Sequence, residues 1–195
     1  MDDSESREAS RWARIMIENE NAPTTARKNA GDKAIVERGL VRDWAESMAG
    51  EFGRYVTDLK AAEEPPDFRG SCDGQPISIE LVQLVDERDL APKKARIKGK
   101  AEPPFDQRLW TPERFRTRIN ATLDAKQAKY EAKPAAFDVL VIHHEHGWLN
   151  AELARGWLAE GSIQPRPHLR NAHLLLSYEP GGPEHRPLCR LYGEL

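Results

Sequence analysis

The segment PPDFRGSCDGQPISIELVQLVD (65–86) constrains the fold of this chain more than any other. Its Asp73-Gly74 pair stands between two extended-type stretches, which is the pattern of a two-residue β-hairpin turn. A turn of this kind fixes the strand register, so that the numbers of paired residues have the same sum as 73 and 74. Phe68 is therefore expected opposite Ile79, on the apolar face of the hairpin.

The same register places Asp67 opposite Glu80, with both carboxylates on the other face of the hairpin. Like charges that face each other across two strands are destabilising, so the pair needs a compensating partner. A divalent cation is one such partner, because Mg²⁺ prefers carboxylate oxygen and keeps water ligands for chemistry. Protonation of one carboxylate, or a Lys or Arg that pairs with both, is the alternative. The register alone leaves both readings open.

The rest of the chain predicts an α/β fold, with a central mixed β-sheet flanked by helices. Helical periodicity or helix-start signals mark the segments 33–60, 112–133 and 150–160. The first of these is expected to break near Gly50 or Gly53. Apolar runs that are typical of strands mark the segments 137–144, 172–179 and 187–195, the last as an edge strand.

Composition limits the ways in which this chain could bind nucleic acid. The 195 residues carry a net charge of -3, so binding would need a local basic patch. The candidate is LAPKKARIKGK (90–100), in a predicted loop at 87–110. Its basic side chains either follow phosphates or are simply solvated. They are Lys93, Lys94, Arg96, Lys98 and Lys100.

The pattern of the chain also predicts its organisation and location. Residues 1–32 are expected to form an N-terminal extension with a short helix at 10–19 and a loop at 18–32. Residues 33–195 are expected to form one domain. No apolar run approaches the ~18 residues of a membrane span. The acidic, polar start is unlike a signal peptide, so a cytoplasmic protein is expected.

One lysine interrupts an otherwise apolar stripe. In the predicted helix at 112–133, Leu123 and Tyr130 belong to the buried face, and Lys126 falls on the same face between them. A lysine in this position either extends its ammonium to solvent or meets an acid. The functional alternative is that the Lys126 ammonium reaches the Asp67 and Glu80 carboxylates.

The motif PPDF (65–68), a short hairpin and then ISIELVQL (77–84) resemble the core of the PD-(D/E)XK nucleases. The resemblance implies a restriction-endonuclease-like core in which Asp67 and Glu80 bind Mg²⁺ or Mn²⁺. In that class a lysine usually follows the glutamate by two residues, where this chain has Val82. Some members carry the lysine on the following helix instead, and Lys126 is the residue that matches.

The resemblance also implies an acid from the first helix, for which Glu37 fits best and Glu46 and Glu51 are alternatives. It further implies a metal-dependent endonuclease acting on DNA, with Asp67, Glu80, Lys126 and Glu37 as catalytic residues. A module of the same fold that has lost catalysis and binds nucleic acid or a protein partner is the alternative. A small-molecule enzyme or a structural domain is a third reading, and a homodimer stays open.

Overall fold

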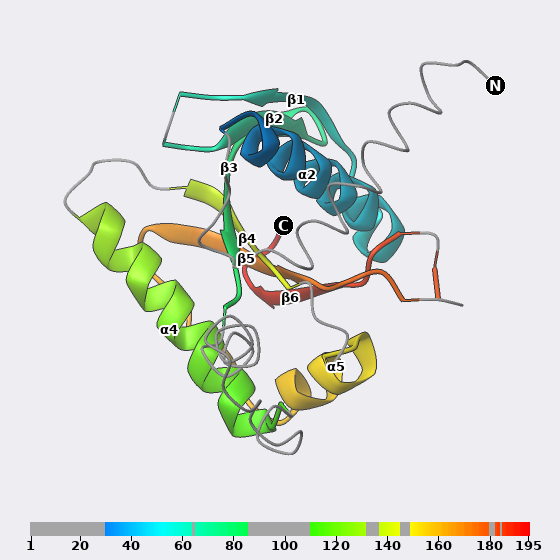
Figure 1. Cartoon of the computed structure of the whole chain (residues 1–195), viewed down its shortest axis with the longest axis vertical. Coiled ribbons are helices and arrows are strands. Elements are labelled where there is room, and N and C mark those ends of the chain that lie inside the picture. Colours follow the sequence, from blue (N-terminus) through cyan, green and yellow to red (C-terminus); the bar gives the residue numbers. More distant parts are fainter. Residues whose placement is uncertain are drawn as a thin grey trace, which may run out of the picture.

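A computed structural model describes residues 30–63, 65–85, 110–131, 137–144, 149–179, 182–183 and 185–195 (Figure 1). The elements, in chain order, are α2 (Ala30–Phe52), β1 (Val56–Ala61), β2 (Phe68–Cys72), β3 (Gln75–Gln83), α4 (Pro112–Glu131), β4 (Phe137–His143), α5 (Ala151–Ala159), β5 (Leu169–Leu175) and β6 (Leu188–Tyr192).

The six strands form one mixed sheet in the order β1-β2-β3-β4-β5-β6. Strands β3, β4 and β5 are parallel neighbours, whereas the pairs β1-β2, β2-β3 and β5-β6 are antiparallel. Parallel neighbours need a crossover, which α4 supplies between β3 and β4 and α5 supplies between β4 and β5. The predicted α/β fold with helices around a central mixed sheet is confirmed.

The sheet separates two hydrophobic cores (Figure 1). On one face α2 buries Trp44 and Met48 against Ile79 of β3. On the other face α4 and α5 cover a larger core. Side chains alternate along a strand, so the residues of β3 with even numbers point toward α4. Glu80 has an even number, which directs its carboxylate to the α4 side.

The hairpin has the predicted turn and register. Asp73 and Gly74 have φ angles of 49° and 82°, both in the left-handed region that the tight hairpin turn requires. Phe68 pairs with Ile79, as the position of the turn predicts. The Asp73 carboxylate also accepts a hydrogen bond from the Tyr55 amide at 2.9 Å, which ties the turn to the start of β1.

The predicted helix at 33–60 starts too late and extends too far, although its expected break near Gly50 or Gly53 is confirmed. Helix α2 begins at Ala30, inside the expected loop, and ends at Phe52. Gly53 has a φ of 63°, a left-handed conformation that commonly ends helices. The following residues form β1, a mostly exposed strand at the edge of the sheet. An exposed edge strand has no apolar run to reveal it, which is why its sequence was assigned to the helix.

The other elements lie close to their predicted positions. Helix α4 begins after Thr111, whose hydroxyl oxygen accepts a hydrogen bond from the Arg114 amide at 3.2 Å, as expected of an N-cap. Strand β5 begins at Leu169, earlier than predicted, and ends at Leu175. The predicted short helix at 10–19 lies outside the described residues.

Candidate functional site

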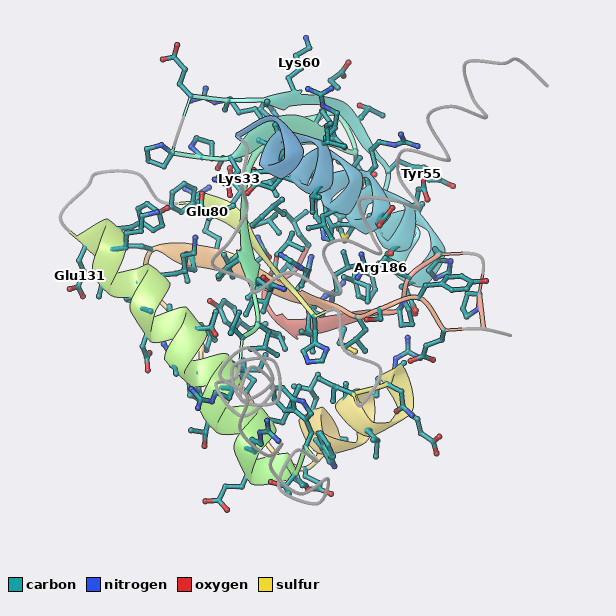
Figure 2. The ribbon with its side chains drawn as sticks, viewed as in Figure 1. Lys33, Tyr55, Lys60, Glu80, Glu131 and Arg186 are labelled. Atoms are coloured by element: carbon teal, nitrogen blue, oxygen red, sulfur yellow. The ribbon has the colours of Figure 1, made fainter. Side chains whose placement is uncertain are left out.

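Glu80 is the centre of the candidate site. It lies on β3, between β2 and β4, and only 3 % of its surface is exposed. Its Oε1 accepts two hydrogen bonds from α4, one from the Lys126 ammonium at 2.7 Å and one from the Tyr130 hydroxyl at 2.5 Å. In Figure 2, Glu80 appears between the start of α2, marked by Lys33, and the end of α4, marked by Glu131.

The second carboxylate oxygen of Glu80 has no such partners. Oε2 is buried, and no donor among the residues that the structure describes reaches it. A buried carboxylate oxygen without a partner is costly, and native proteins rarely leave one. A hard divalent cation would satisfy this oxygen, because carboxylate oxygen is the ligand that such cations prefer. An unpaired carboxylate oxygen is one feature that a metal ligand would have.

Lys126 is largely buried and does not extend to solvent. Its side chain is 15 % exposed and pairs with Glu80, and its ammonium also lies 3.4 Å from the Leu81 carbonyl oxygen. The expected meeting of Lys126 with the hairpin carboxylates is thus observed at Glu80. Val82, two residues after Glu80, packs against the core under α4 and brings no charge. The ammonium group of the site is therefore that of Lys126 on α4 and does not come from position 82 on β3.

Asp67 directly precedes β2, and β2 is the neighbour of β3, the strand that carries Glu80. Its Oδ2 accepts a hydrogen bond from the Leu81 amide at 2.7 Å. The pKa of Asp67 is raised to about 6, chiefly by burial and also by the charges of Glu80 and Glu37, while the hydrogen bond from the Leu81 amide and the Lys126 charge lower it. The two predicted metal ligands therefore share one electrostatic environment.

Glu37 is the acid of α2 that the structure associates with this environment. Its side chain is 19 % exposed, and it forms an ion pair with Lys33 at 3.5 Å. The negative charge of Glu37 contributes to the raised pKa of Asp67. The two alternatives differ: Glu51 pairs with Arg155 at 2.6 Å, and Glu46 is exposed.

Tyr130 is the residue of the site that sequence reasoning missed. It was expected only as part of the apolar stripe of α4, yet its hydroxyl donates to Glu80 Oε1. Residues four apart on a helix lie on one face, so its spacing from Lys126 was the available signal. The basic segment at 90–100 lies outside the described residues.

The described residues contain no larger cluster of metal-ligating side chains. No group of three or more His, Cys, Asp and Glu side chains there is arranged to hold a metal ion. A site at Asp67 and Glu80 would have two carboxylate ligands, and Mg²⁺ is usually bound through one or two carboxylates and several waters.

None of the helices among the described residues has the length and apolarity to cross a membrane.

Comparisons with models of known protein families, with curated proteins and with solved structures gave no match. A functional assignment therefore depends on the geometry and the chemistry of the site.

The raised pKa of Asp67 predicts a pH-dependent stability in the absence of metal. The unfolded carboxyl ionises near 3.8 and the folded one at about 6, so the folded state loses stability as the pH rises between these values. The shift corresponds to at most roughly 3 kcal/mol. Urea unfolding in EDTA should show Asp67→Asn to be more stable than wild type at pH 7.5 and equal to it below pH 4. A variant less stable than wild type at pH 7.5 would contradict the assignment.

Proposed function

We propose that this protein is a metal-dependent nuclease that hydrolyses the phosphodiester bonds of DNA, with Mg²⁺ or Mn²⁺ held by Asp67 and Glu80. The observation that carries the proposal is the buried Oε2 of Glu80, which receives no hydrogen bond from the described residues and lies beside a second carboxyl. The Lys126 ammonium contacts Oε1 of Glu80 at 2.7 Å. Two acids that could hold a cation and one buried lysine that could neutralise developing charge are groups suited to metal-assisted phosphate chemistry.

Each side chain has a role in this mechanism. A bound Mg²⁺ would supply Lewis acidity at the scissile phosphate and would lower the pKa of the attacking water. Lys126 would neutralise negative charge that develops on the phosphate oxygens, because its ammonium is fixed before the reaction. Tyr130 would hold Oε1 of Glu80 and so keep Oε2 directed to the cation. Glu37 would add negative charge beside Asp67 and strengthen cation binding.

A second candidate function is a module of the same fold that binds nucleic acid or a partner without cleaving. The observation in its favour is Val82, because this position carries the lysine in the resembled class. Lys126 counts against the inactive module, since its ammonium reaches Glu80 from α4 and could replace the lysine that is missing at position 82. Activity decides between the two candidates.

A cleavage assay with purified protein tests the proposal. Plasmid DNA and a labelled single-stranded oligonucleotide should each be incubated with Mg²⁺, with Mn²⁺ and with EDTA. We expect cleavage of DNA with either metal and none in EDTA, because the proposal assigns the activation of water to the bound cation. If no divalent metal supports cleavage of single-stranded or double-stranded DNA, the binding module becomes the better assignment.

A further inference from the structure

A groove lies between α4 and the end of β3, beside the candidate site. Its volume is about 460 Å³, and the described residues that line it come from the end of β3, from the residues just after that strand and from one face of α4. Along α4 the lining extends from Arg118 to Lys129, which is about 16 Å on the helix axis. The groove is therefore elongated along the helix.

The groove and the candidate site share Lys126. Lys126 lines it and also donates to Glu80, and Val82, two residues after Glu80, lines its other wall. A ligand that occupied the groove would thus lie beside Lys126, which holds Glu80.

The lining combines cations with small apolar side chains. Arg118, Lys126 and Lys129 are the charged residues among the described lining, and none of that lining is acidic. Ala121 and Ala125 are exposed on α4 and form part of its surface. Cations next to an apolar surface suit a ligand that has both anionic groups and flat apolar groups, as a nucleotide has.

The size of the groove favours single-stranded DNA over duplex DNA as its ligand. Its volume lies within the range of roughly 300–1,000 Å³ that is usual for sites of small ligands. A duplex keeps its bases stacked inside and could offer only its phosphates to such a groove. A single strand can insert a base or sugar and place its phosphates along the cations of α4.

We propose that this groove binds a single strand of DNA, one to a few nucleotides long, next to the scissile phosphate. The inference rests on the proposed nuclease function, because it takes the groove to lead the strand to Asp67 and Glu80. It goes further than that function in naming single-stranded DNA as the form of substrate that the site receives.

Binding without metal tests the proposal independently of catalysis. Fluorescence anisotropy in EDTA should measure the affinity for a labelled 12-nucleotide thymidine oligomer, for the same oligomer in a duplex and for the matching uridine oligomer. We expect the single DNA strand to bind more tightly than the duplex. Tighter binding of the duplex would overturn the proposal, and tighter binding of the uridine oligomer would replace DNA by RNA.

Two pairs of variants test whether the single strand of DNA binds in the groove. Ala125→Trp fills the groove from an exposed helix position and should weaken binding roughly tenfold or more. Ala128→Trp, at an exposed position of α4 outside the groove lining, should change nothing. Lys129→Gln should reduce the slope of log affinity against log salt by about 0.7, the value for one phosphate contact on a single strand. Lys60→Gln, on the distant strand β1 (Figure 2), should leave that slope unchanged.

The outcomes separate the groove from the nuclease. If Ala125→Trp binds the oligomer like wild type, the groove proposal fails, even where the wild-type protein cuts DNA. If Ala125→Trp loses binding but the wild type never cleaves, the groove stands and the nuclease proposal fails.

Discussion

Replacing Glu80 by glutamine is expected to abolish metal-dependent cleavage while the protein stays folded. The amide keeps an oxygen that can accept the hydrogen bonds from Lys126 and Tyr130, so the contacts between β3 and α4 persist. It loses the negative charge that a divalent cation needs. Metal assistance is worth several kcal/mol, so initial rates with Mg²⁺ should fall about 10³-fold or more.

A matched control shows whether the effect is specific to the site. Glu131→Gln removes one carboxylate from the exposed end of α4 (Figure 2) and should cleave like wild type. Circular dichroism should show that both variants are folded. Wild-type rates in Glu80→Gln would mean that Oε2 is not a metal ligand.

Replacing Lys126 by methionine is expected to slow cleavage and also to weaken the fold. The methionine keeps an apolar stem for packing but removes the ammonium that contacts Glu80 at 2.7 Å. Electrostatic groups fixed at a reacting centre are typically worth about 10²–10³ in rate. Removing one partner of a buried ion pair typically costs about 3–5 kcal/mol, and the Tyr130 hydroxyl, which still donates to Glu80, should keep the loss at the lower end.

The double variant Lys126→Met with Glu80→Gln separates the two effects. It removes both charges, so it should recover part of the free energy of unfolding that Lys126→Met loses, and none of the activity. Lys60→Met is the control for the loss of an exposed lysine far from the site. Full activity in Lys126→Met would leave the lysine with a structural role alone.

The parts of the site that depend on local sequence could be predicted. The Asp73-Gly74 turn sets the register by itself, since only a few backbone conformations join two strands through two residues. The position of Asp67 beside Glu80 followed from that register. The stripe on α4 placed Lys126 on the buried face, although the stripe alone did not decide whether the lysine would meet an acid.

The parts that depend on packing could not be predicted in the same way. Glu80 and Tyr130 are 50 residues apart, and only the crossing of α4 over β3 brings the hydroxyl to the carboxylate. That no donor among the described residues reaches Glu80 Oε2 likewise depends on what surrounds this oxygen in three dimensions. Strand β1 was missed because an exposed edge strand lacks the apolar alternation that reveals strands in a sequence.

Diffraction from crystals soaked in Mn²⁺ tests the metal site most directly. We expect an anomalous difference peak about 2.1 Å from a carboxylate oxygen of Asp67 and from Oε2 of Glu80, with waters in the remaining positions. The peak should disappear in crystals of Glu80→Gln grown at the same pH. A wild-type crystal in which Mn²⁺ binds elsewhere, while Lys126 occupies the space between the two carboxylates, would contradict the account.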